Sequence, residues 1–295
     1  MNHFKIKKSL ISYFPLAAII FAGASFSSAS VANDITQIIR SDTEQTGSTE
    51  NYLEIGIMYA AGSGPSFGDD DGNKSETMQL INFSYNWNDL FIENYSESGT
   101  GITFGYNAFN NDNWSLDLTV TTDRWQFYFD NNGRYPAINN EKYSDPLTVG
   151  VRLTSYLGNN VVQFSVNQDA TGDHNGTTIS ALIGRNWQVR NWNFHGIVGV
   201  EYASVKLNDY HIGVSDARAA SPRFDFIEGG ASAYEAGDSV SFSTELGVTY
   251  PITQDWVFRA TGRVATISDE ITDSPYYVTK DSVATSFRTS LSYVF

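Results

Sequence analysis

The chain of 295 residues contains no cysteine, and it has only seven prolines and four histidines. Without cysteine it has no disulfide framework, no thiolate metal site and no cysteine nucleophile. Long apolar runs are also scarce, because only one N-terminal stretch approaches the roughly 20 apolar residues of a membrane helix. The formal net charge is −15. A surface this acidic is repelled by phosphates, which excludes nucleic acid as a partner.

That N-terminal stretch has the features of a secretory signal peptide. Three lysines lie among the first eight residues, an apolar run follows at residues 10–24, and Ser30 and Ala32 are the small residues of a cleavage site. We predict cleavage after Ala32, so that residues 1–32 are removed. Since no cysteine follows the site, a lipoprotein is excluded, and loss of the three lysines leaves a net charge of −18.

Residues 33–50 are polar and are predicted to be a short periplasmic tether. From residue 51 onward, apolar and polar residues alternate with the period of two that predicts β-strands. Around residue 244, for example, Phe242 and Leu246 share one face, and Ser241 and Glu245 share the other. The alternating segments are 51–61, 78–87, 89–96, 100–109, 113–125, 146–157, 160–169, 176–188, 192–208, 239–250, 255–267 and 282–295.

The connections between these twelve segments differ in length in a regular way. Those after even-numbered segments are short, whereas the long ones, residues 62–77, 126–145, 209–238 and 268–281, follow odd-numbered segments. Outer-membrane barrels have short periplasmic turns, long extracellular loops and an even strand number. We therefore predict that residues 51–295 are all-β, a transmembrane antiparallel up-and-down β-barrel of about twelve strands in the cell outer membrane, with periplasmic N- and C-termini. A secreted two-sheet sandwich would also alternate, but it has no reason to send its long loops to one side.

The last segment, residues 282–295, ends on an aromatic residue. Leu291, Tyr293 and Phe295 lie on its apolar face. A tilted strand of this length can cross a bilayer, and its terminal aromatic residues would lie in an interfacial girdle. The segment resembles the C-terminal assembly signal of bacterial outer-membrane barrels. The expected partners are therefore the barrel assembly machinery and the lipid and lipopolysaccharide of the outer membrane.

Charged residues recur on the polar faces of the segments and are predicted to form a cluster in the lumen. In a water-filled pore they would set ion selectivity, whereas in a narrow lumen they must pair. Matching the tenth and eleventh segments through a tight turn puts Tyr250 level with Trp256 and Glu245 opposite Thr261, diagonal to two arginines. We therefore predict that Glu245 forms an ion pair with one or both of them. The predicted lumen residues are Glu54, Asp117, Arg152, Glu201, Glu245, Arg259, Arg263 and Arg288.

Several of the predicted loops contain segments that resemble those of a known family, namely Tyr210–Ser215, Asp216–Ser221, Ala233–Gly237, Asp273–Val278 and Gly64–Asp69. The family is that of the MipA/OmpV outer-membrane proteins, and the similarity runs from about residue 50 to the end. The resemblance implies an outer-membrane barrel, and members are described as a scaffold between a murein-cleaving lytic transglycosylase and a murein synthase, or as adhesins. Murein hydrolase and synthase proteins are thus expected partners by resemblance.

Catalytic and metal-binding patterns are weak. His174 is interpreted as a surface loop residue and His195 as a hydrogen-bonding lumen residue near Glu201, and no serine lies in the nucleophile elbow of an esterase. The acidic run at residues 69–73 does not fit an EF-hand loop. We expect no catalytic residue, no metal site and no cofactor.

The predicted function is a non-enzymatic scaffold or interaction protein of the cell envelope. The alternatives are a small-solute channel and, more distantly, an outer-membrane barrel hydrolase.

Overall fold

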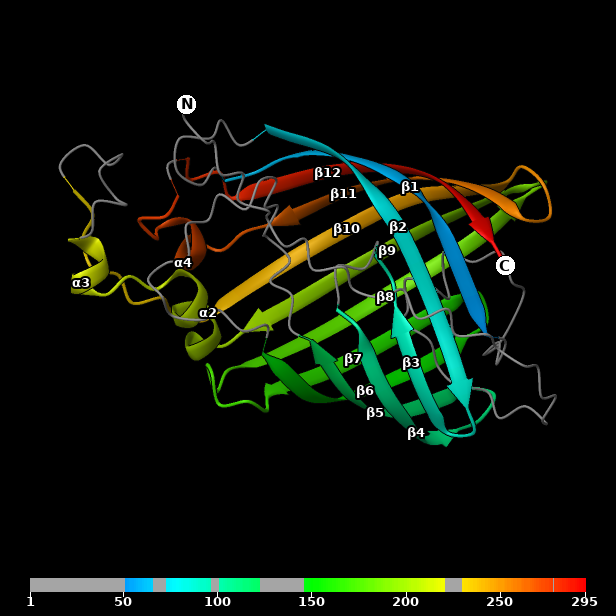
Figure 1. Ribbon diagram of the computed structural model, residues 1–295, viewed down its shortest axis with the longest axis horizontal. Coiled ribbons are helices and arrows are strands. Elements are labelled where there is room, and N and C mark those ends of the chain that lie inside the picture. Colours follow the sequence, from blue (N-terminus) through cyan, green and yellow to red (C-terminus); the bar gives the residue numbers. More distant parts are fainter. Residues whose placement is uncertain (1–50, 66–72, 97–100, 123–145, 221–229, 278) are drawn as a thin grey trace, which may run out of the picture.

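Twelve antiparallel strands form a closed barrel in the computed structural model, which describes residues 51–65, 73–96, 101–122, 146–220, 230–277 and 279–295 (Figure 1). Each strand pairs with its neighbours in sequence, and β1 pairs with β12 to close the barrel. The predicted fold class is confirmed. The strands are β1 (Tyr52–Ser63), β2 (Asn73–Trp87), β3 (Leu90–Asn94), β4 (Thr103–Asn110), β5 (Trp114–Thr122), β6 (Leu147–Leu157), β7 (Asn160–Asp169), β8 (Thr177–Val189), β9 (Trp192–Ala203), β10 (Ser239–Pro251), β11 (Trp256–Thr266) and β12 (Val283–Val294).

Short turns and the C-terminus lie at the same end of the barrel, which we call the turn end (Figure 1). Three of these hairpins have only two residues between their strands, and each contains a residue of positive φ: Asn88, Gly158 and Arg190. Positive φ suits such hairpins because the twist of the turn then matches the twist of the strands. The opposite end carries the longer connections and is called the loop end.

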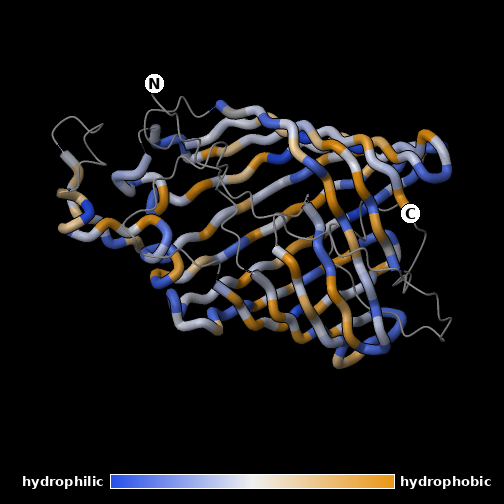
Figure 2. The backbone as a smooth tube through the Cα atoms, viewed as in Figure 1, coloured by the Kyte–Doolittle hydropathy of each residue, from blue (hydrophilic) through white to orange (hydrophobic). Residues whose placement is uncertain are grey.

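The barrel is apolar outside and polar inside. Large side chains on the outer face are exposed, including Ile57 at 63% and Leu246 at 61%, whereas Glu54 and Asp117 on the inner face are 0% exposed. This alternation is visible along the strands in Figure 2. At the turn end, aromatic rings contact each other on the outer face, as in the tilted pair of Trp192 and Tyr250, whose ring centroids are 4.4 Å apart. An exposed apolar band with an aromatic border is the surface that a bilayer covers.

Two strand limits differ by five residues from those expected. β2 begins at Asn73, five residues earlier than predicted, so that the first long connection is shorter. β9 ends at Ala203, and residues 205–212, part of which was predicted as strand, form a helix. The helices lie at the loop end and are α2 (Val205–Ile212), α3 (Asp216–Ala219) and α4 (Asp269–Thr272) (Figure 1). Within the described ranges, no helix is long and apolar enough to cross a membrane.

Candidate functional site

The inner wall of the barrel is the first candidate site. All eight predicted lumen residues face the inside of the barrel. Residues that pair directly across neighbouring strands point to the same face, and the pairs followed from strand to strand connect each of the eight to the inward-facing Glu54 on β1. They do not form one cluster. Some belong to two separate buried networks near the turn end, and others line a more exposed wall near the loop end.

The first network joins the strands at the closing seam. Arg259 on β11 forms an ion pair with Glu54 on β1, passing across the inner face of β12, where the Ser292 hydroxyl also donates to Glu54 Oε1. Asn82 on β2 donates to Glu54 Oε2 at 3.0 Å. Arg259 is 5% exposed and Ser292 is 0% exposed. Both oxygens of this buried carboxylate therefore have partners, which the burial of a charge requires.

The second network lies further round the wall. Arg152 on β6 contacts Asp117 on β5 at 3.0 Å and Glu93 on β3 at 2.5 Å. Asn107 on β4 donates to Asp117 Oδ1 at 2.7 Å. The Arg152 guanidinium also lies 5.3 Å from the centre of the Phe91 ring. One arginine thus connects four consecutive strands on the lumen side, again with buried partners.

Glu245 does not have the predicted geometry. Tyr250 pairs with Phe258 rather than Trp256, so Arg263 and not Thr261 lies directly opposite Glu245. The Glu245 carboxylate lies 3.2 Å from His195 Nε2, and Arg259 pairs with Glu54. The register prediction was therefore wrong by two residues, although a shift of two keeps every side chain on its predicted face. His195 does lie in the lumen, where its Nε2 atom contacts the Glu245 carboxylate.

Burial divides the lumen into two halves. Inward residues near the turn end have almost no solvent exposure, and they include apolar side chains such as Leu80 at 0% and Met58 at 2%. Some inward residues nearer the loop end, among them Glu201, Arg263 and Arg288, are half-buried, whereas others there, such as Asp169 and Ser239, are buried. The lumen is therefore filled at the turn end, and part of its wall nearer the loop end reaches solvent.

Helices and loops at the loop end form a second candidate site, the loop cap (residues 204–220, 230–238 and 267–277). Ile212 at the end of α2 packs with Ala236, Ile267 and Ile271 in a buried apolar cluster. Val214 packs against Tyr276 in a second cluster. Segments that resemble the known family, although distant in sequence, thus pack against each other.

Hydrogen bonds connect the same segments of the loop cap. Ser274 Oγ donates to the Ile212 carbonyl at 2.7 Å, and the backbones of Val214 and Tyr234 exchange two bonds of 2.8 Å. The Tyr234 hydroxyl donates to the Glu270 carbonyl at 2.7 Å. Burial raises the pKa of Tyr234, and the nearby carboxylates of Glu270 and Asp273 raise it further. This tyrosine therefore stays a protonated donor at neutral pH.

The loop histidine His174 is buried, at 7% exposure, so its interpretation as a surface residue was wrong. Its Nδ1 accepts from the Gly176 amide at 2.8 Å, and its ring lies 5.4 Å from Tyr210 and 6.3 Å from His211. In the described part of the chain, no group of three or more His, Asp or Glu side chains could hold a metal ion. The acidic run at residues 69–73 lies outside the described residues except for Asn73.

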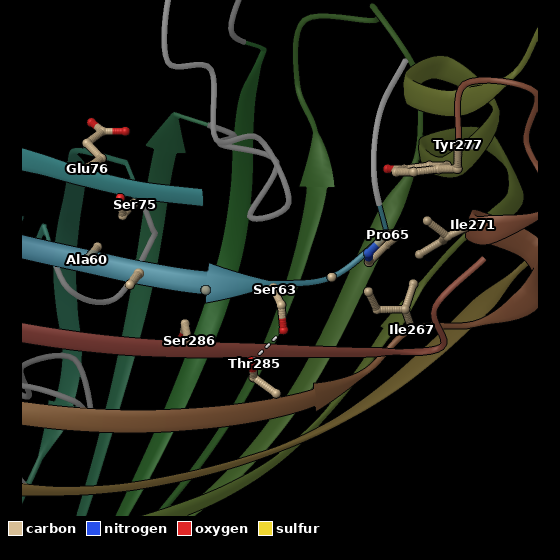
Figure 3. Close-up of a pocket in the computed structure, with 13 residues that line it drawn as sticks. Ala60, Ser63, Pro65, Ser75, Glu76, Ile267, Ile271, Tyr277, Thr285 and Ser286 are labelled. Atoms are coloured by element: carbon tan, nitrogen blue, oxygen red, sulfur yellow. Dashed lines mark hydrogen bonds between the residues drawn. The ribbon is translucent and has the colours of Figure 1, made fainter. Parts of the chain in front are cut away.

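A cavity of about 90 Å³ opens between β1, β2, β12 and the loop cap (Figure 3). Its walls include Ala60 and Gly62 on β1, and Ile267, Ile271 and Tyr277 from the connection after β11. Nothing in the sequence analysis indicated this cavity, because its two walls come from segments about 200 residues apart.

Glu93 and Asn107 also escaped the sequence analysis. The buried residues Phe91 and Glu93 on β3, and Tyr95 just after it, mix apolar and charged side chains, so that alternation gives no contrast between the two faces. The C-terminal residues lie as predicted on the outer face, and the Phe295 amide donates to the Leu53 carbonyl at 2.9 Å. The role of Leu291, Tyr293 and Phe295 in assembly remains a prediction.

Comparisons with known proteins give a consistent result. The family model described as "MltA-interacting protein MipA" matches residues 55–295. The "MltA-interacting protein" of Escherichia coli (strain K12) is 36% identical over 78 residues, which span 26% of this chain and only 29% of that relative. The "Putative outer membrane protein YiaT" of the same strain is 23% identical over 247 residues, 84% of this chain and 92% of that protein.

Two solved outer-membrane barrels resemble the structure more loosely. The NanC porin aligns with a TM-score of 0.40 and 11% identity, covering 80% of this chain and 98% of the porin. The COG4313 outer membrane channel from Pseudomonas putida F1 aligns with a TM-score of 0.39 and 12% identity, covering 85% and 99%. Together the barrel and the relatives place the protein in the outer membrane. With a family model that spans nearly all of the barrel, the chain belongs to the MltA-interacting protein MipA family.

Proposed function

We propose that this protein is a non-enzymatic scaffold of the outer membrane that binds murein enzymes through the turn end of its barrel. The observation that carries the proposal is the filled turn-end half of the lumen, in which Glu54, Asp117, Arg152 and Arg259 are buried and paired. Charges that line a conducting path face water. A barrel whose charges are instead used in buried pairs is a rigid platform rather than a wide pore.

The kind of partner comes from the family. The name of the E. coli relative refers to an interaction with MltA, and the resemblance described above points to a murein-cleaving lytic transglycosylase and a murein synthase. Murein lies in the periplasm, and the short turns are expected to face that compartment. The proposed binding surface is therefore formed by turns such as Gly158-Asn159 and Arg190-Asn191, which are exposed.

Site-specific photo-crosslinking in cells tests the scaffold. A photoreactive residue at Asn159 in a turn should crosslink to the lytic transglycosylase, whereas the same residue at the exposed Glu235 of the loop cap should not. Crosslinking from Glu235 alone, or from neither position while both variants fold, would contradict the proposal.

A small-solute channel is the second candidate, favoured by the half-exposed Arg263 and Arg288 at the loop end. Planar-bilayer recordings separate the two functions. The scaffold predicts no stable conductance from the wild-type barrel, and a channel predicts steady ion-selective openings. Openings that appear only after Arg152→Ala would indicate that the filled half blocks the path.

A further inference from the structure

Two arginines lie side by side on the inner wall of the loop-end half. Arg288 on β12 pairs with Thr261, and Arg263 is two residues further along β11, so the arginines are diagonal neighbours on one face. Diagonal neighbours in a sheet are about 7–8 Å apart, which lets two long side chains reach one ligand. Both are half-exposed, whereas Arg152 and Arg259 at the turn end are buried and ion-paired.

The charge of Arg263 is not neutralised by the residue opposite it. Glu245 lies directly opposite Arg263, but the Glu245 Oε1 atom is 3.2 Å from His195 Nε2. Among the residues that the structure describes, Arg263 makes no hydrogen bond or ion pair. An anion bound to Arg263 would supply the missing counter-charge, and the neighbouring Arg288 guanidinium would add a second set of donors.

Hydroxyl groups lie next to the arginines. Ser286 pairs with Arg263 across the β11–β12 ladder, and Ser290 is two residues from Arg288 on the same inner face. Ser290 is 4% exposed, and its Oγ has no hydrogen-bond partner in the described part of the chain. Buried hydroxyls usually have a partner. Guanidinium groups with adjacent hydroxyls form the donor set that binds a carboxylate or a phosphate.

The cavity beneath the loop cap adjoins this donor set. Ser286 lines the cavity as well as lying opposite Arg263, while Ile267, Ile271 and Tyr277 form its apolar wall (Figure 3). Glu76 on β2 also lines the cavity, separated from Arg288 on the wall by the small Ala60 of β1. Neither arginine lines the cavity itself, whereas Glu76 does. A ligand would therefore extend from the apolar wall past Ser286 to reach the arginines.

We propose that the loop-end half of the lumen binds a small organic monoanion, with its anionic group on Arg263 and Arg288 and its apolar part beneath Ile267, Ile271 and Tyr277. Glu76 limits the ligand to a single negative charge, because a second one would face its carboxylate. The site is independent of the proposed scaffold role, since it lies in the loop-end half and needs no path through the filled half.

Binding of benzoate to the purified full-length barrel in detergent tests this site. Benzoate carries one carboxylate and a six-carbon ring, benzyl alcohol has the same ring without the charge, and phthalate adds a second carboxylate. Titrations followed by NMR or calorimetry should show saturable binding of benzoate. Benzyl alcohol and phthalate should each bind at least about tenfold more weakly, because a charge-assisted contact is lost or a like charge is added.

Variants separate the groups involved. Arg263→Gln and Arg288→Gln should each weaken benzoate binding about tenfold, and Glu76→Gln should reduce the discrimination against phthalate. Arg185→Gln is the matched control, because Arg185 is exposed on the outer face of β8, and it should bind benzoate as the wild type does. Heat-modifiability on gels shows which variants fold.

Two results would overturn the proposal. One is the absence of saturable benzoate binding to the folded wild-type barrel. The other is equal affinity for benzoate and benzyl alcohol, which decides the question even where an arginine variant does not fold.

Discussion

The buried ion pair between Glu54 and Arg259 should contribute strongly to the stability of the closed barrel. Arg259→Gln leaves a carboxylate that is 0% exposed without its arginine, although Asn82 and Ser292 still donate to it. Removal of one member of a buried pair costs about 3–5 kcal/mol, because the remaining charge is uncompensated. We expect a loss of this size, which is a large fraction of the stability of a typical domain.

Glu54→Gln should cost a similar amount, because it leaves the buried Arg259 guanidinium without its carboxylate, although Arg259 still donates to the Ser292 hydroxyl at 3.3 Å. The double variant removes both charges and lets two amides bond to each other. Its cost should therefore be smaller than the sum of the single costs. We expect a coupling energy of about 2–3 kcal/mol, at the upper end of the range for residues in contact.

Urea unfolding in detergent measures these costs through tryptophan fluorescence, since the chain has six tryptophans. The control cycle combines Arg259→Gln with Glu245→Gln. Thr249 is the residue opposite Arg259, so Glu245 is four residues away along β10. That cycle should show coupling below about 0.5 kcal/mol. If Glu54 and Arg259 couple no more strongly than the control pair, the seam network is not present in the folded barrel.

Three further predictions concern assembly, orientation and the loop cap. Replacement of both Tyr293 and Phe295 by serine should reduce barrel assembly, and a wild-type amount of heat-modifiable protein in the outer membrane would refute the assembly signal. An epitope tag at Gly230 should be detected on intact cells, whereas a tag at Asn159 should require permeabilisation; the reverse pattern would invert the topology. Ser274→Ala removes a buried bond worth about 1 kcal/mol and should speed trypsin cleavage in the loop cap without changing global unfolding, and unchanged cleavage would show that this bond does not hold the cap.

The faces of the strands could be predicted from the sequence because a period of two survives in almost every segment. The register could not. A shift of two residues leaves each side chain on the same face, so the pattern fits both Trp256 and Phe258 opposite Tyr250. The structure has the second pairing, with the four residues 252–255 in the turn. Local pattern likewise fails at α2, where Val205 and Leu207 alternate as they would in a strand but lie in a helix.

The sequence also does not indicate which charged side chains form ion pairs with each other. Glu54 and Arg259 are separated by 205 positions, and Arg152 reaches Glu93 across two intervening strands. Such contacts depend on the curvature of the closed wall and on strand stagger, which are properties of the whole barrel. The sequence indicated only that paired charges were required if the lumen was narrow.

The amino-acid pattern was enough to predict the barrel, its alternating faces and the side of the sheet on which each charge lies, because strand geometry translates a period of two directly into inside and outside. It also separated the short turns from the long loops. Closure of the barrel decided the rest. By joining β1 to β12 and curving the wall, it buried the Glu54 and Arg152 networks at the turn end. The same closure left Arg263 and Arg288 half-exposed at the loop end, since only tertiary packing sets how much of an inward face water can reach.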